Sequence, residues 1–509
     1  MSFTRGGVRP AAALLAACLG LGMVVSPAVA DESDQAGTLA VGSLPQDVAN
    51  AVDLTGVNRH LIALQRIAES HGGTRAAGDP GYDASIDYVV GRLRAAGYDV
   101  STPEFSYELF VAQTERLAVA GETIEVEALT YSPSTSEGGL AAPLAVLPAG
   151  SELGCTPEDF AGVEVDGDVV LIRRGECDFA LKARLASEAG AAAVLIANNE
   201  AGSVNGTLGD PSAARIPTGG VTQEAGDALT SQDGAEVDFE LIAGIEEHSS
   251  RNVIAQTRTG RTDNVVVAGA HLDSVYAGIN DNGTGSAGLL ETALQLGGAP
   301  DIDNAVRFAW WGAEELGLHG STQYVRSLDF EQQLDIALYL NFDMIGSPNA
   351  GYFVLDGDGS EGLSAPGPYG SAQIEQAFVD YFADGGLETE GSDFSGRSDY
   401  AEFIAVGIPS GGLFTGAEGV KTQEQADKWG GVAGEPYDAS YHLPADDLGN
   451  VDRVALERNA KAVAYVTTAY GETTEAVNGV PPREDRAAMR AGLRADTAAL
   501  AHQGEDATR

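Results

Sequence analysis

Apolar residues recur at helical spacing in two stretches near the start of the folded chain, at Val57, Leu61, Leu64 and Ile67 and at Ile86, Val90 and Leu93. Residues three and four positions apart lie on one face of a helix, so each stretch predicts a helix with one apolar side. The second helix is expected to end in AAGYDV, where Gly97 closes it and a strand begins that reaches Val100.

Beyond about residue 246 the pattern changes to continuous apolar runs that alternate with helical segments. The runs VVVAGA, AVRFAWWG and IALYLNF contain almost no polar position, which is typical of strands buried on both faces of a sheet. SAGLLETALQL, which follows the first run, has the spacing of a helix. This alternation predicts an α/β fold in which helices cover a central sheet.

Residues 128–245 have a different texture. They are rich in Gly, Ala and Ser, and short strands such as GDVVLIRRG and AAAVLIANN are separated by turns. Because the flanks on either side resemble each other more than they resemble this block, we predict an inserted domain. The flanks, 45–127 and 246–472, would then form one discontinuous domain.

The two ends of the chain carry separate signals. Arg5 and Arg9 precede a mostly apolar run and an AVA sequence, which predicts a secretory signal peptide over residues 1–30 and an exported protein. The run is too short for a membrane span. LAAC, ending at Cys18, also resembles a lipoprotein processing site, so a lipid anchor is the less favoured alternative. The Ala- and charge-rich tail, 473–509, is expected to be helical or disordered.

Charge and cysteine content narrow the picture further. The chain has 509 residues, with 75 Asp and Glu against 29 Lys and Arg, and its formal net charge is −46. Since like charges repel, nucleic acid and anionic membranes are excluded as expected partners. After removal of the signal peptide only Cys155 and Cys177 remain, and two cysteines in an exported chain predict a disulfide, with two free thiols as the alternative.

Polar residues follow the ends of the predicted strands. HLDS contains His271, GINDNGTGSAG contains Asp281, AWWGAEEL contains Glu314 and Glu315, NFDMIGS contains Asp343, and YHLPADD contains Tyr441 and His442. Each motif alone has a structural explanation, such as a turn, a helix cap or a core histidine. Functional groups of an open α/β sheet gather beyond the carboxyl ends of strands. Together, two histidines and several carboxylates are the ligands that a two-zinc hydrolase needs.

These motifs, together with GRSDYAEFIAVGIPSGGLFTGAE, resemble the secreted two-zinc aminopeptidase family of the bacterial leucyl aminopeptidase type. The resemblance implies a zinc exopeptidase fold, with a mixed central β-sheet flanked by helices. The block GDVVLIRRGECDFALKARLASEAGAAAVLIANN resembles a protease-associated domain, so the insert is expected to be a smaller, β-rich α/β domain. The implied activity is that of a metallo-aminopeptidase, which hydrolyses N-terminal, preferably bulky apolar residues from peptides.

The resemblance also implies a role for individual residues. His271 and Asp343 would hold one Zn²⁺ and Glu315 and His442 the other, with Asp281 bridging the two ions. Glu314 would act as general base on a water that bridges the metals, and Tyr441 would donate to the developing oxyanion. Asp273 would orient His271, and Arg397 and Phe414 would contact the substrate. A structural Ca²⁺ is a further candidate without a motif of its own.

The other histidines are expected to have no part in the site. His319 is predicted on the helix after the glutamates, and His60, His71, His248 and His502 are predicted at the surface.

Other functions of the same fold stay open at this point. One is a two-zinc carboxypeptidase or deacylase; a carboxypeptidase needs a cation for the terminal carboxylate, and Arg397 is the candidate. Another is a glutaminyl-cyclase-like transferase, which is expected to use a single zinc. A third is a non-catalytic binding ectodomain, which the intact set of ligands disfavours. A monomer is expected.

Overall fold

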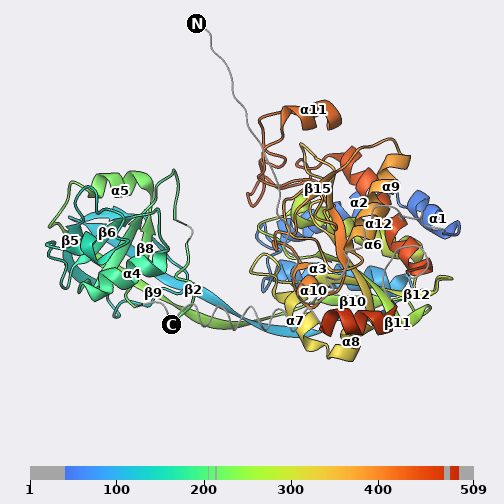
Figure 1. The fold of residues 1–509 in the computed structure, drawn as a ribbon, viewed down its shortest axis with the longest axis horizontal. Coiled ribbons are helices and arrows are strands. Elements are labelled where there is room, and N and C mark those ends of the chain that lie inside the picture. Colours follow the sequence, from blue (N-terminus) through green and yellow to red (C-terminus); the bar gives the residue numbers. More distant parts are fainter. Residues whose placement is uncertain (1–40, 205, 213–214, 475–481, 492–509) are drawn as a thin grey trace, which may run out of the picture.

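Two eight-stranded sheets organise the part of the chain that the computed structural model describes, residues 41–204, 206–212, 215–474 and 482–491. One sheet lies in the larger of two bodies, and the second extends into the smaller body through a long two-stranded ribbon (Figure 1). The predicted signal peptide, Cys18 and His502 lie outside the described residues.

The sheet of the larger body is mixed. Its strands run in the order β1 (Asp99–Ser101), β10 (Val253–Gln256), β12 (Asn304–Trp311), β11 (Arg261–His271), β13 (Ile336–Phe342), β16 (Ser410–Phe414), β14 (Phe353–Leu355) and β15 (Glu390–Ser392). The four strands from β12 to β16 are parallel, whereas β10 and β14 pair antiparallel with their inner neighbours. All seven residues of β13 are buried, as expected for a parallel strand covered on both faces.

Helices cover both faces of this sheet. In β11, Val266 and Ala268 belong to one hydrophobic core and Val265 and Val267 to another, because successive side chains of a strand point to opposite faces. The first face is covered by α1 (Leu44–Ala51), α2 (Leu54–Ser70), α3 (Pro80–Ala95), α6 (Gly285–Leu296), α9 (Ser371–Asp384) and α12 (Arg453–Glu472). Further helices of this body are η3 (Ile279–Thr284), α7 (His319–Ser327), α8 (Phe330–Leu334), α10 (Ala401–Ala405) and α11 (Gln423–Trp429).

The smaller body is joined to the larger one by two long antiparallel strands, β2 (Glu104–Val119) and β9 (Glu236–Arg251) (Figure 1). Its other strands are β3 (Glu122–Ile124), β4 (Glu127–Ala128), β5 (Leu140–Val146), β6 (Val169–Arg173), β7 (Ala193–Ala197) and β8 (Thr218–Val221). Its helices are η2 (Pro157–Phe160), α4 (Phe179–Glu188) and α5 (Gln223–Leu229). The predicted domain boundary after residue 245 lies within β9, and the boundaries stay predictions.

The structure confirms the predicted α/β fold, with helices on a mixed sheet and a smaller β-rich unit. It also contains the predicted disulfide, between Cys155 and Cys177. Among the described residues, no helix is both long enough and apolar enough to cross a membrane. In the tail, residues 483–491 are helical.

One histidine prediction is wrong. His60 lies in α2 and is fully buried, not at the surface. Its Nε2 lies 2.9 Å from Glu291 Oε2 on α6, and its Nδ1 lies 2.7 Å from the hydroxyl of Tyr88 on α3. Burial lowers the pKa of His60, so the neutral ring links three helices of one layer. His319 begins α7, as predicted, and stacks on Tyr107 of β2.

Candidate metal centre

Three neighbouring parallel strands end at the same edge of the sheet in the larger body and carry most of the candidate site. β11 ends at His271, Glu314 and Glu315 follow the end of β12, and Asp343 directly follows β13. Because β12, β11 and β13 are adjacent in the sheet, these side chains meet although up to 72 positions separate them. Asp281 comes from η3, between β11 and α6.

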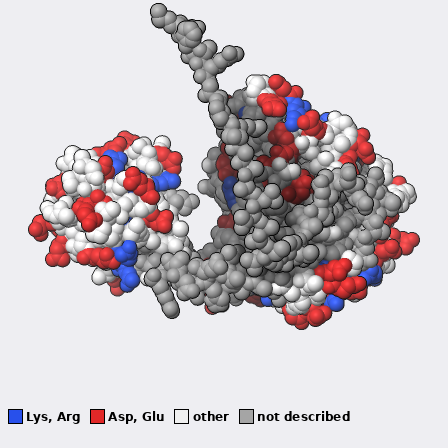
Figure 2. All heavy atoms as spheres, in the orientation of Figure 1, with Lys and Arg blue, Asp and Glu red and all other residues white. Residues whose placement is uncertain are grey.

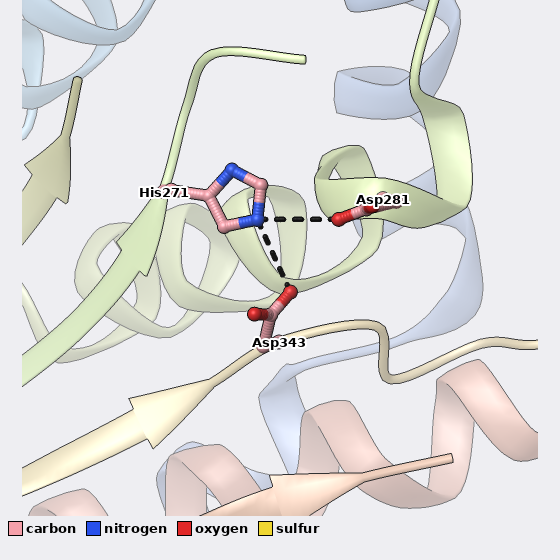
Figure 3. A group of neighbouring side chains, drawn as sticks. All are labelled: His271, Asp281 and Asp343. Carbon is pink, nitrogen blue, oxygen red and sulfur yellow. Dashed lines mark hydrogen bonds and ion pairs between the residues drawn. The ribbon is translucent and has the colours of Figure 1, made fainter. Parts of the chain in front are cut away.

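His271, Asp281 and Asp343 form a first group of three side chains that point toward one point in space (Figure 3). His271 Nε2 lies 3.2 Å from Asp281 Oδ1 and 3.2 Å from Asp343 Oδ1. A second group consists of Asp281, Glu315 and His442. His442 Nε2 lies 3.1 Å from Asp281 Oδ2 and 2.9 Å from Glu315 Oε2. The two groups therefore share Asp281, which offers one oxygen to each.

Glu314 lies beside these groups without belonging to either. It is 9 % exposed, and its Oε2 lies 3.9 Å from His271 Nε2. Its neighbour Glu315 is part of the second group, so the two adjacent glutamates differ in what they contact. Both side chains line a cavity of about 250 Å³ that opens onto the two groups.

The backbone around the site contains several left-handed residues. Five of the eight non-glycine residues with positive φ among those described lie in loops at this edge: Tyr276, Ala313, Leu318, Met344 and His442. Such conformations cost about 1–3 kcal/mol each and persist only where the surrounding contacts hold them. The loops are thus held in place by their contacts and not by local preference.

The buried carboxylates of the two groups favour the binding of cations. Burial raises the pKa of Glu314 well above its ordinary value and that of Glu315 to about 7. Burial alone would lower the pKa of His442, but hydrogen bonds with Asp281 and Glu315 raise it to about 10. Two imidazole nitrogens and three carboxylates, one of them shared, are a donor set that suits two closely spaced divalent ions of the zinc type.

Further hydrogen bonds hold the carboxylates in place. The hydroxyl of Ser398 donates to Asp343 Oδ2 at 2.7 Å and accepts from Asn341 Nδ2 at 2.9 Å. Asp446 Oδ2 accepts from the backbone N–H of Asp281 at 3.0 Å. The backbone N–H of Val275 donates to Glu315 Oε1 at 3.2 Å. Oxygens that are held in this way lose less freedom when a metal binds.

Asp273 contacts both His271 and the two adjacent glutamates. His271 Nδ1 lies 3.1 Å from the backbone carbonyl oxygen of Asp273 and 3.7 Å from its carboxylate. The carboxylate oxygens of Asp273 instead accept from the backbone N–H groups of Glu314, at 3.2 Å, and Glu315, at 3.3 Å. Asp273 therefore ties the loop after β12 to the loop after β11.

Tyr441, Arg397 and Phe414 all line the cavity. The ring of Tyr441 stacks on that of His442, with centroids 3.9 Å apart, and its hydroxyl accepts from Arg397 Nη2 at 3.4 Å. Arg397 Nη1 also donates to Glu418 Oε1 at 2.7 Å. Apolar side chains complete part of the wall: Met344, Leu355, Leu413 and Phe414.

Comparison with known proteins identifies the family. Residues 252–467 match peptidase family M28, and residues 140–229 match the PA domain. A protein of Mycobacterium tuberculosis described as a probable lipoprotein aminopeptidase is 49 % identical over 444 residues, which cover 86 % of this chain and 89 % of that protein. The chain belongs to peptidase family M28.

Two further proteins that are similar to this chain carry names that describe their chemistry. Leucine aminopeptidase 2 of Trichophyton rubrum is 39 % identical over 444 residues, which cover 86 % of this chain and 87 % of that protein. The structure of a zinc aminopeptidase from Bacillus subtilis superposes with a TM-score of 0.65 at 26 % identity, and covers 84 % of this chain and 97 % of that one.

Several residues of this M28 site had not been singled out from the sequence. Ser398 lies within the quoted GRSDY motif, and Asp446 lies within YHLPADD, so both could have been suspected from their motifs. Arg75 lies in HGGTRAAGD, far from every motif, and its guanidinium nevertheless donates to backbone carbonyls between His271 and Asp281. No local pattern indicates this role.

A third group of acidic side chains lies apart from the histidines of the M28 site. Asp356, Asp358 and Glu375 offer only oxygen ligands, and such a set suits Ca²⁺ better than Zn²⁺. Backbone N–H groups already satisfy much of this group: Ser360 N donates to Asp356 Oδ1 at 3.0 Å, and Gly357 N donates to Glu375 Oε2 at 2.8 Å. These bonds explain the cluster without an ion.

Proposed function

We propose that this M28 peptidase is an exported aminopeptidase that binds two zinc ions. His271 and Asp343 would hold one ion, Glu315 and His442 the other, and Asp281 would bind both. The observation that carries the proposal is the shared carboxylate, because one oxygen of Asp281 lies 3.2 Å from His271 Nε2 and the other lies 3.1 Å from His442 Nε2. The zinc aminopeptidase of Bacillus subtilis supports the choice of metal.

Glu314 is the general base in this proposal. When bound, the zinc ions polarise the scissile carbonyl and lower the pKa of a water molecule. Glu314 lines the cavity and belongs to neither ligand group, and its Oε2 lies 3.9 Å from Nε2 of the proposed ligand His271, so its carboxylate would accept a proton from that water. As the carbon–oxygen bond forms and the carbon–nitrogen bond breaks, Glu314 returns the proton to the leaving amine.

Tyr441 would stabilise the oxygen of the scissile carbonyl. Its hydroxyl lies at the edge of the cavity and already has Arg397 Nη2 as a donor, which leaves its own proton free to be donated. A hydrogen bond aimed at the oxygen that gains negative charge lowers the barrier more than it stabilises the bound substrate.

The cavity would take the first residue of the peptide. Asp343 and Glu314 offer oxygens to a free α-ammonium group, and Met344, Leu355, Leu413 and Phe414 offer an apolar wall to the side chain. A leucine side chain has three more carbons than alanine, which is worth about 2.4 kcal/mol at most if all three are buried. We therefore expect a preference for leucine-like residues, in agreement with the name of the Trichophyton rubrum relative.

Arg397 argues against a carboxypeptidase. A cation that clamps a terminal carboxylate has to be available to it. In this structure Arg397 Nη1 donates to Glu418 Oε1 at 2.7 Å, so its charge is already paired at the mouth of the cavity. The pair favours a substrate that presents an amine and a side chain.

The decisive assay compares leucyl peptides that have a free amine with the same peptides acetylated on that amine. The expected result is hydrolysis of the free peptides alone, loss of activity with a chelator and recovery with Zn²⁺. Two zinc ions per chain are expected by elemental analysis. Equal cleavage of acetylated peptides from the carboxyl end would replace the aminopeptidase by a carboxypeptidase.

Export leaves two forms to distinguish. We propose a freely secreted protein that begins after residue 30. Acidic side chains are spread over both bodies on the face drawn in Figure 2. The name of the Mycobacterium tuberculosis relative favours the second form, a lipoprotein anchored at Cys18. Mass spectrometry of the mature N-terminus separates the two, because only the anchored form begins with a lipid-modified cysteine.

A further inference from the structure

Arg75 is a fully buried arginine whose hydrogen bonds all converge on one loop of the site. Its guanidinium donates to three carbonyl oxygens: that of Ala277 at 2.9 Å, that of Gly278 at 2.7 Å and that of Leu272. Its backbone N–H donates to the carbonyl of Tyr276 at 3.1 Å. One residue therefore holds four carbonyls of the loop 272–278, which joins His271 to the segment that carries Asp281.

The loop that Arg75 holds also contacts both glutamates of the site. The carboxylate of Asp273 accepts from the backbone N–H groups of Glu314 and Glu315. The backbone N–H of Val275 donates to Glu315 Oε1. A displacement of this loop would therefore move one proposed zinc ligand and the proposed general base together.

Charge by itself does not explain why an arginine lies here. Burial lowers the pKa of Arg75 to about 10, although Asp273 and Asp446 act in the opposite direction, so the side chain is charged at neutral pH. A fixed positive charge that interacts with the proposed ligands Asp281 and Glu315 would oppose the binding of cations there. The planar guanidinium, however, has five N–H donors in a rigid arrangement, and so it can reach carbonyls in several directions at once.

We propose that Arg75 is a positioning residue for the metal centre, which it preorganises by fixing the backbone of residues 272–278. Zinc then binds to ligands that already face one another, and Glu314 stands beside them without further rearrangement. The metal-binding part of this inference rests only on the proposed zinc ligands, and the part that concerns Glu314 rests on the proposed function.

Arg490 provides a matched control. It is 1 % exposed, and its guanidinium also donates to three backbone carbonyls, those of Gly407 at 3.2 Å, Ile336 at 2.9 Å and Gln333. Ile336 begins β13, whereas Asp343 follows the other end of that strand. Arg75→Met and Arg490→Met thus remove the same kind of side chain and the same kind of contact at opposite ends of the sheet.

The test measures unfolding by urea with a chelator and with excess Zn²⁺ in the wild type, Arg75→Met, Arg75→Lys and Arg490→Met. We expect both Arg75 variants to bind zinc at least tenfold more weakly, which shrinks the zinc-dependent gain in stability by about 1.4 kcal/mol per tenfold. Arg490→Met should lose equal stability with and without zinc. Arg75→Lys keeps the charge and decides the matter if Arg75→Met does not fold.

Three results would overturn the proposal. The first is a zinc-dependent gain in Arg75→Met that equals that of the wild type, which would mean that Arg75 does not affect zinc binding, or that exceeds it, which would mean that the charge of Arg75 repels zinc. The second is full zinc affinity in Arg75→Lys, since one ammonium group cannot replace the guanidinium contacts. The third is an equal loss of zinc affinity in Arg490→Met, which would indicate a general loosening of the fold.

Turnover at saturating zinc gives an independent readout. Because the loop positions Glu314 through Asp273, we expect kcat for a leucyl substrate to fall at least tenfold in Arg75→Lys while KM changes little. An increase in KM at unchanged kcat would contradict a role through Glu314. If the wild type hydrolyses no peptide, the proposed function fails, yet the zinc-binding comparison still tests the role of Arg75.

Discussion

Ser398 offers a sharp test of the first proposed zinc site, because its side chain contacts a ligand of that site and no ligand of the second. Its hydroxyl donates to Asp343 Oδ2 at 2.7 Å and accepts from Asn341 Nδ2 at 2.9 Å. Ser398→Ala removes both bonds and leaves the side-chain amide of Asn341, which is 3 % exposed, without that acceptor. A buried polar group left without a partner costs about 1–3 kcal/mol of stability.

The expected effect on metal binding follows from the loss of the bond to Asp343. Partners that hold a metal-binding carboxylate are worth roughly 10–100-fold in metal affinity. We expect Ser398→Ala to lower the affinity for the ion at His271 and Asp343 by this factor. The affinity for the ion at Glu315 and His442 should stay unchanged. Competition with a chromogenic chelator resolves the two ions as separate steps.

Ser371→Ala is the control for this experiment. Ser371, like Ser398, is buried, and its hydroxyl accepts from the backbone N–H of Ser410 at 3.0 Å, but it touches none of the proposed ligands. The Ser371→Ala variant should lose a comparable amount of stability and bind both ions with wild-type affinity. Two results would refute the assignment of Asp343 as a ligand of the first ion only. One is an equal loss of affinity for both ions in Ser398→Ala, and the other is zinc affinities in Ser398→Ala that equal those of Ser371→Ala.

Three further predictions concern the base, the cavity and a buried histidine. Glu314→Gln should keep two zinc ions and lose at least about hundredfold in kcat, whereas Glu315→Gln should lose one ion; equal metal loss in both variants would reverse the roles. Phe414→Ala should narrow the ratio of kcat/KM between leucyl and alanyl substrates, and an unchanged ratio would remove Phe414 from the pocket. The folded-state pKa of His60 lies below its unfolded value, so protonation of the unfolded chain should destabilise the protein as pH falls below about 6.5. The free energy of unfolding, measured with urea between pH 7 and pH 5, should therefore fall less steeply with pH in His60→Gln than in the wild type, by up to about 1.4 kcal/mol per pH unit. The same pH dependence in both proteins would contradict this prediction.

Local pattern explains why most of the site could be predicted. His271, Glu315 and Asp343 each stand at or just beyond the end of an apolar run, and each run is long enough to be a buried strand. Parallel strands place such ends at one edge of the sheet, so residues 72 positions apart in the chain meet there. The division into two groups that share Asp281 was expected only from the resemblance to the two-zinc aminopeptidase family, and not from local pattern.

His60 shows where local pattern misleads. A single histidine in a helix carries no sign of its burial, because the partners that satisfy its ring nitrogens, Tyr88 and Glu291, lie on other helices. Whether such a side chain is exposed depends on how α2, α3 and α6 pack. A surface position was predicted because His60 lies outside every motif, and the prediction was wrong for this reason.

What the sequence by itself determined is therefore the set of elements and the residue types at their ends, since hydrophobic periodicity and motif spacing are local properties of the chain. Only the tertiary structure decided which distant groups support those residues. Arg75 reaches the loop beside His271 across about 200 positions, and Ser398 reaches Asp343 across 55. Such contacts depend on the order β12, β11, β13, β16 in the sheet and on the packing of loops above it, and no periodicity along the chain encodes either.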